Sequence, residues 1–165
     1  MMGQVFEVKV IKPKKMNIPA VRQAVLEALE AEAQDILADY RQTTATWEHQ
    51  VEFETIIDIT SQEASVLVGT DDPIFRYVDE GTRPHMIFPR RARKLRFQTG
   101  YSAKTKPGKI GSWPGGKYGP VVFADRVSHP GTKAREFTKA IQKRRKSKFT
   151  RRMVEAMKAG AERLY

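Results

Sequence analysis

Four residues of this sequence have the chemistry of a small metal site. Asp79 and Glu80 stand shortly before His85, which follows a proline, and His129 precedes another proline much further along the chain. If the two proline turns meet in the fold, two carboxylates and two imidazoles form a ligand set that transition metals accept. Such a site would support a metal-dependent nuclease. A turn histidine is more often a hydrogen-bonded structural residue, and we favour that interpretation.

Other catalytic signatures are missing from the sequence. It contains no His-Glu-x-x-His pair, no complete Gly-x-x-x-x-Gly-Lys-Ser/Thr loop and no Gly-x-Ser-x-Gly turn. The absence of cysteine excludes disulfides, thiolate metal sites and cysteine nucleophiles. We therefore expect a protein that is not an enzyme and that has no cofactor.

The first proline turn is expected to be rigid and to lead into a basic extended segment. Gly81 permits a positive φ, and Pro84 and Pro89 fix their own φ and hold the preceding residue extended. Cations crowd the residues that follow. Phe88 and Phe97 are expected in the core, on either side of a basic face.

The second proline turn repeats this composition in a different order. Its order is His-Pro-Gly-Thr, whereas the first turn has Gly-Thr-Arg-Pro-His. We expect both turns to act as structural corners that set the directions of the strands beside them. The corner residues are Gly81, Thr82, Arg83, Pro84, His85, Pro89, His129, Pro130, Gly131 and Thr132.

These motifs also indicate a family. The motifs Gly-Thr-Arg-Pro-His-Met-Ile-Phe-Pro (81–89), Lys-Leu-Arg-Phe (94–97) and Val-Ser-His-Pro-Gly-Thr-Lys-Ala-Arg-Glu-Phe (127–137) follow a predicted N-terminal helix in that order. In this arrangement the chain resembles the head–tail joining and tail-completion proteins of long-tailed bacteriophages and their prophages. The resemblance covers residues 18–142, and it departs from the family pattern at Glu136, where a proline is expected.

The resemblance implies a structural virion protein of the phage neck or tail, assembled in the bacterial host cytoplasm. It implies an α+β subunit that assembles as a hexameric ring coaxial with the tail tube. The implied partners are further copies of the chain, the head connector or adaptor, and tail terminator or tail tube proteins, with DNA passing through the lumen and no membrane.

Charge is divided unequally along the chain. Residues 1–80 contain 7 Lys or Arg and 15 Asp or Glu, whereas residues 81–165 contain 23 and 4, and the whole chain has a net charge of +11. Opposite charges on two faces suit head-to-tail contacts between copies, which close into rings where the rotation allows. The same division suits a sequence-nonspecific DNA-binding module. A solvated surface without a partner is the third interpretation.

The candidate contact residues, for a protein interface or a DNA backbone, are cations and one tryptophan. Aromatic side chains do not alternate with these cations as base stacking requires, so any DNA contact is expected with the duplex backbone. Trp113 is either a packing anchor or an exposed contact. The candidates are Arg90, Arg91, Arg93, Lys94, Arg96, Lys104, Lys106, Lys109, Trp113, Lys117, Lys143, Arg144, Arg145, Lys146 and Lys148.

Hydrophobic periodicity predicts an α+β fold with a mainly antiparallel sheet packed against a long N-terminal helix. We expect a strand at 4–11, a helix from an N-cap at Asn17 to about Arg41, and a polar connector at 43–46. A hairpin at 51–69 and a short helical turn after Asp72-Pro73 come next.

The second half is predicted to hold a long basic loop and a C-terminal helix. The loop at 99–120 lacks periodicity and is expected to become ordered against partners. The strand at 121–127 is expected to pair with 94–98, and a helical pattern runs from Lys133 to the end. Five cations within 143–148 repel one another, which predicts that the helix splits there or stays outside the body. We therefore expect one domain at 1–142 and a basic extension at 143–165, with no apolar run near the roughly 18 residues of a membrane span.

Overall fold

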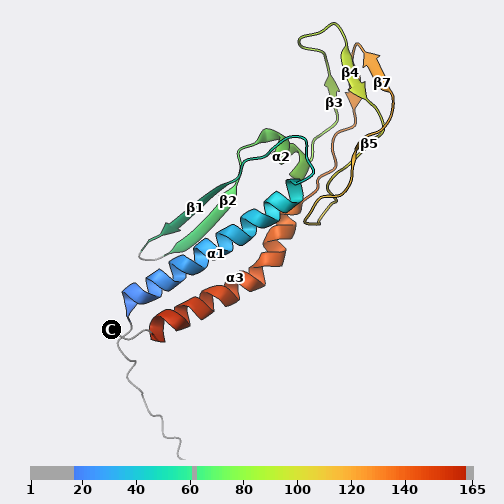
Figure 1. The fold of residues 1–165 in the computed structure, drawn as a ribbon. Helices are drawn as coiled ribbons and strands as arrows, with labels where there is room; N and C mark the ends of the chain where they lie inside the picture. The colour runs from blue at the N-terminus through green and yellow to red at the C-terminus, as the bar shows by residue number, and fades with distance from the viewer. Residues whose placement is uncertain (1–16, 61–62, 163–165) are drawn as a thin grey trace, which may run out of the picture.

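The computed structural model describes residues 17–60 and 63–162 and confirms the α+β class. Figure 1 shows the long helix α1 between a β-hairpin on one side and the antiparallel helix α3 on the other. An arm of short strands projects from the end of this body where α1 finishes and α3 starts. The strand expected at 4–11 lies outside the described residues.

Helix α1 spans Ile18–Thr44 and begins where predicted. Its N-cap is Asn17, whose side-chain oxygen accepts a hydrogen bond from the Ala20 backbone N–H at 3.1 Å. The predicted connector at 43–46 is wrong in its first half, because Thr43 and Thr44 continue the helix. Their hydroxyl groups donate to carbonyl groups one turn earlier, so α1 itself satisfies these polar side chains.

The predicted hairpin is confirmed as strands β1 (Glu54–Ile59) and β2 (Ala64–Gly69), which pair antiparallel. One face of the hairpin packs on α1, and the other faces solvent. Ile56 and Leu67 are register partners on the solvent face, with exposed fractions of 58% and 64%. The hairpin therefore presents an apolar pair that nothing in the described chain covers.

The buried core lies where α1, the short helix α2 (Pro73–Asp79) and the start of α3 meet. The short helical turn predicted after Asp72-Pro73 is confirmed as α2, and the carboxylate of Asp72, its N-cap, accepts from the Phe75 N–H at 2.8 Å. The Phe75 ring packs edge-on against Phe137 and Tyr40, with centroid distances of 4.9 and 5.8 Å. Each such aromatic pair adds about 0.5–1.5 kcal/mol to the stabilisation from burial.

Helix α3 spans Phe137–Glu162 without a break, so the prediction that the 143–148 cations split it or hold it outside the body is wrong. Carboxylates on α1 neutralise part of this cluster, as described below. Residues 142 and 143 both lie inside this helix. Near its end, Gly160 packs so closely on α1 that an added Cβ would lie 2.5 Å from the Val21 Cα. The two helices are therefore held together by charge at one end and by close backbone approach at the other.

Residues 81–134 form the arm (Figure 1). The predicted pairing of 94–98 with 121–127 is confirmed, but the single basic strand expected after Pro89 is wrong because residues 90–94 bend between two strands. In the described chain each strand pair is a separate two-stranded sheet. The pairs are β3 (His85–Ile87) with β8 (Val127–His129), β4 (Leu95–Gln98) with β7 (Val121–Ala124), and β5 (Tyr101–Ser102) with β6 (Gly116–Lys117).

Candidate functional site

The two proline turns meet at one backbone bridge at the base of the arm. The Thr82 N–H donates to the Thr132 carbonyl at 2.9 Å, and the Thr132 N–H donates back at 3.2 Å. The Thr132 N–H also reaches the Thr82 hydroxyl at 2.9 Å. The two corners that the sequence places far apart therefore form one root, from which both chain segments enter the arm.

Glycine is required on both sides of this root. Gly81 has a φ of 81°, and a Cβ there would lie 2.5 Å from the Thr132 carbonyl oxygen. Gly131 has a φ of 88°, and its Cβ would meet the Thr82 carbonyl oxygen. Since L side chains rarely adopt this conformation and no space remains for one, the paired glycines permit the close approach.

The two corner histidines lie side by side at the base of the arm. His85 and His129 are register partners, with ring centroids 5.0 Å apart. The His129 Nδ1 accepts from the Gly131 N–H at 3.1 Å, whereas the His85 Nδ1 lies 2.8 Å from the Arg83 carbonyl and therefore donates to it. Both rings thus hydrogen-bond to the backbone of their own turn.

The two carboxylates considered with the histidines have other positions. The Asp79 carboxylate accepts from the Thr138 N–H at 3.3 Å, at the start of α3. Its carbonyl accepts from the backbone of Arg135 and Glu136, each at 3.0 Å. Glu80 is exposed. Among the described residues, no three His, Cys, Asp or Glu side chains lie close enough together to hold a metal ion.

Cations dominate the arm. Residues 81–134 contain 12 Lys or Arg and one Asp, a formal charge of +11, whereas the described body contains 13 Lys or Arg and 17 Asp or Glu, a charge of −4. The single acid of the arm, Asp125, lies 3.9 Å from Lys94, and both side chains are exposed. Lys104 lies 3.5 Å from Glu48 of the body. Most of the positive charge of the arm is therefore unmatched within the described chain.

Aromatic side chains share this basic surface, which the sequence did not lead us to expect. Phe88 is 59% exposed, so the prediction that it lies in the core is wrong. It follows β3, at the point where the arm has no second layer to cover it. Phe97 is half-buried. Three further aromatic rings of the arm are exposed, those of Tyr101, Tyr118 and Phe123.

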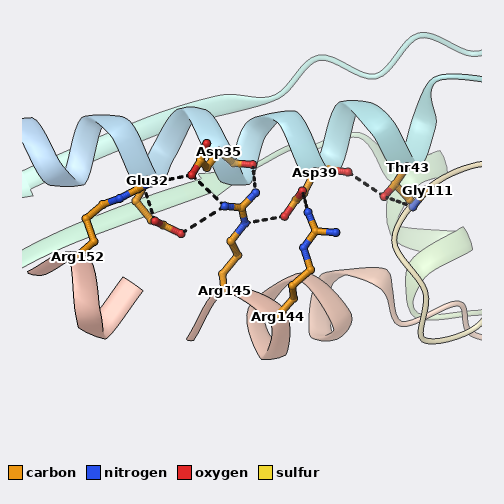
Figure 2. A network of polar contacts seen from close by, with 8 residues as sticks. All are labelled: Glu32, Asp35, Asp39, Thr43, Gly111, Arg144, Arg145 and Arg152. Carbon is orange, nitrogen blue, oxygen red and sulfur yellow. Dashed lines mark hydrogen bonds and ion pairs between the residues drawn. The ribbon is translucent and has the colours of Figure 1, made fainter. Parts of the chain in front are cut away.

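Part of the loop expected at 99–120 is bonded to the body of its own chain. The Gly111 N–H donates to the Thr43 hydroxyl at 3.1 Å, a contact visible at the right of Figure 2. The Ser112 hydroxyl donates to the carbonyl groups of Gln42 and Thr43 in the last turn of α1. Ile110 packs on the aromatic core. This segment therefore has intramolecular partners, and the strands β5 and β6 pair within it. Trp113 is half-buried, with the Lys106 ammonium 4.9 Å from its ring centroid.

A buried ion-pair network joins α1 to α3 (Figure 2). Arg145, whose side chain is 11% exposed, donates to Asp39 at 2.7 Å and to Asp35 at 3.0 Å. Arg144 also bonds to Asp39. Of the candidate contact cations on α3, Arg145 is thus used inside the subunit, while Lys143, Lys146 and Lys148 are exposed.

A second part of the network surrounds Glu32, which is fully buried. Its Oε2 accepts from Arg152 at 2.5 Å, and its Oε1 has no hydrogen-bond partner but lies 3.9 Å from Arg145. Arg152 also bonds to Asp35 at 2.9 Å, and this hydrogen bond is the main reason why the pKa of Asp35 is below its ordinary value. Hydrogen bonding to Asp39 has the matching effect on the cation: it raises the pKa of Arg145, because it stabilises the charged guanidinium.

Sequence reasoning missed this network, although a signal was present. Glu32, Asp35 and Asp39 are spaced three and four residues apart and share a face of α1. This face lies beside apolar residues with the same spacing, such as Leu29, Ile36 and Tyr40. Arg145 and Arg152 are seven residues apart and share a face of α3. Matching the two spacings would have predicted helix pairing.

Comparison of the chain with protein-family models, with curated proteins and with solved structures gives no match. Within 17–60 and 63–162, no helix has both the length and the apolar character needed to cross a bilayer.

Proposed function

We propose that this chain is a structural, non-enzymatic subunit of a phage neck or tail, which completes the tail end and joins it to the head connector by assembling as a ring. The observation that best supports this proposal is the arm: a projection with a charge of +11 and exposed aromatic rings, attached to a body with a charge of −4. Apart from the 104–112 segment, which bonds to the body, the exposed cations and rings of such an arm gain more from neighbours than from their own subunit.

The arrangement of the body supports the same proposal. The α1–α3 network connects the two helices through residues of the body alone, while the arm contributes Ile110 to the edge of the aromatic core. The strands of the arm beyond this segment are therefore available to contact neighbouring copies, the head connector or adaptor, and tail terminator or tail tube proteins. In this proposal the two proline corners act as structural residues that fix the direction of the arm.

Electron microscopy of particles made without the protein tests the proposal. We expect filled heads together with separate or unfinished tails, and we expect supply of the wild-type chain to restore joined particles. A chain with Phe88→Ser and Phe123→Ser, which removes two exposed rings of the arm, should restore fewer. Val154→Ser, which removes an exposed apolar side chain of α3, is the matched control and should restore joining fully. Normal virions in the absence of the chain would overturn the proposal.

A sequence-nonspecific DNA-binding module is the second candidate function, and one observation favours it. The exposed rings of Phe88 and Phe123 lie on the strongly basic arm, which brings together cations and aromatic surfaces. Phosphate neutralisation would make the affinity fall steeply with salt. A mobility shift measured at rising salt decides between the candidates: a steep slope that flattens in Arg91→Gln favours DNA binding, whereas no shift at physiological salt excludes it.

A further inference from the structure

The solvent face of the β1–β2 hairpin has the features of a docking surface. Ile56 and Leu67 form its exposed apolar centre. Together with Glu54 and Asp71 they line a shallow hollow at one end of the hairpin. An exposed apolar pair in a hollow costs solubility unless a partner covers it.

Acidic side chains surround this apolar pair. Glu54 and Asp58 lie two positions before and after Ile56, and therefore point to the same solvent face of β1. Asp71 borders the hollow. None of these three carboxylates belongs to an ion pair within the part of the chain that the structure describes. The surface thus selects an apolar partner with basic neighbours.

The solvent face of the β4–β7 pair on the arm has the complementary features. Val121 and Phe123 are 44% and 61% exposed and lie two positions apart on the same face of β7. Arg96 is the register partner of Phe123, and Lys94 stands two positions before Arg96. An aromatic and an aliphatic side chain are therefore bordered by two cations, of which Lys94 lies 3.9 Å from the exposed Asp125 and Arg96 has no ion pair among the described residues.

We infer that the β4–β7 face of one copy docks on the β1–β2 face of the next copy, with Phe123 over Ile56 and Leu67, and with Arg96 and Lys94 against Glu54 and Asp58. In Figure 1 the β1–β2 hairpin lies along α1, whereas the β4–β7 pair lies in the arm that projects past the end of α1, so the two strand pairs of one subunit are apart. The contact is head-to-tail and repeats from copy to copy, which generates a ring when the rotation closes. This inference deepens the proposed function, since it names the surfaces through which a ring would form.

Cysteine cross-linking tests the contact directly, because the wild-type chain has no cysteine. A chain with Leu67→Cys and Phe123→Cys should form, under mild oxidation, a ladder of disulfide-linked multimers. The control combines Phe123→Cys with Val154→Cys, an exposed position on α3 (44%) outside the proposed contact. We expect at least a tenfold higher yield of linked multimers than in the control. Equal yields at the same protein concentration would overturn the inference.

A charge exchange tests the specificity of the contact. One chain bears Glu54→Lys and Asp58→Lys on the hairpin, and another bears Lys94→Glu and Arg96→Glu on the arm. Each chain alone faces like charges at every contact, so sedimentation should show self-association weakened at least tenfold. An equal mixture should recover the wild-type association, because each altered face then meets an opposite one in an alternating assembly.

Further controls distinguish loss of the contact from misfolding of a variant and from failure of the proposed function. A single chain with all four changes should associate as the wild type does, and its unfolding midpoint shows whether the variants are folded. Failure of both the mixture and the folded fourfold variant to associate would overturn the inference. Because these measurements use the purified chain alone, such a failure leaves the virion role to the particle experiment. Loss of the virion role with intact cross-linking would overturn only the proposed function.

Discussion

Among the described residues, many charged side chains are paired with one another in the body of this protein, whereas most of those in the arm are unpaired. In the body, carboxylates of α1 meet guanidinium groups of α3, and the central partners are buried. In the arm, 12 cations share a single acid, and that acid is exposed. The two regions also differ in apolar cover, since the body has an aromatic core and the arm has exposed rings.

This difference separates the residues that stabilise the subunit from those available for contacts. Changing a body charge leaves its buried partner unmatched, so we expect loss of folding free energy. Changing an arm charge leaves no buried partner, so we expect a loss of association with little effect on folding. Four predictions test this separation, in order of decreasing effect.

Removal of Arg145 should have the largest effect. Arg145→Ala leaves buried Asp39 with Arg144 alone and buried Glu32 with Arg152 alone, and we expect the free energy of unfolding to fall by about 3 kcal/mol, the lower end of the range for breaking a buried ion pair. Arg145→Lys retains the charge but loses the forked geometry of the guanidinium. Its free energy of unfolding should lie between those of Arg145→Ala and the wild type. Urea unfolding measures both. Lys146→Ala, the next position on α3, is the control and should stay within about 0.5 kcal/mol of the wild type.

A side chain at the arm root should have the next largest effect. Gly81→Ala forces an L residue into a left-handed conformation, which alone costs roughly 1–3 kcal/mol, and places a Cβ against the Thr132 carbonyl. Besides lower stability, we expect faster amide exchange at Thr82 and Thr132. Gly69→Ala is the control, because Gly69 has no positive φ and open space around it. Equal exchange rates in the two variants would contradict this account of the root.

The contact between the 99–120 segment and α1 gives the third prediction. Thr43→Val leaves the buried Gly111 N–H without an acceptor, and we expect a loss of roughly 1–3 kcal/mol, at or below that at Gly81. Thr44→Val is the matched control, since the Thr44 hydroxyl bonds only within α1 and its loss should cost less. A similar loss in both variants would show that the segment is not held by this bond.

Acid should produce the smallest of the four effects through Asp35. Its folded-state pKa is below the ordinary 3.8, so the ionised carboxylate adds stability above that value, and this contribution is lost as pH falls through the folded pKa. Because Asp35 is partly exposed, we expect a difference below about 1 kcal/mol. Asp35→Asn should make stability fall less steeply below about pH 4, whereas Asp58→Asn, outside the network, is the control. An unchanged slope in Asp35→Asn would contradict the assignment.

Local patterns predicted much of the fold. The Asn17 cap, the alternating hairpin and the pairing of β4 with β7 depend on near neighbours in sequence or on strand periodicity, and all three are confirmed. The errors involve distant contacts. Cations at 143–148 suggested repulsion because their partners lie on α1, about a hundred residues earlier in the chain. Phe88 suggested a core because apolar type does not reveal whether a second layer exists.

The candidate site was predictable only in part. The corner residues were identified from their glycines and prolines alone. The sequence left open whether the two corners meet, and in the structure they do meet, at the Thr82–Thr132 bridge. The surface pairing proposed between copies could not be predicted, because it needs the exposure of Ile56, Leu67 and Phe123. A one-residue shift in strand register would turn each of these side chains to the opposite face.

The single bridge at Thr82 and Thr132 has a consequence for how such proteins can diversify. Since both segments of the arm enter through that bridge, insertions or deletions in the bend at 90–94 alter the reach of the arm while leaving the helices and the contact of Gly111 with Thr43 unchanged. The outer part of the arm can therefore change in length independently of the helices. One helical scaffold can thereby carry arms of different reach.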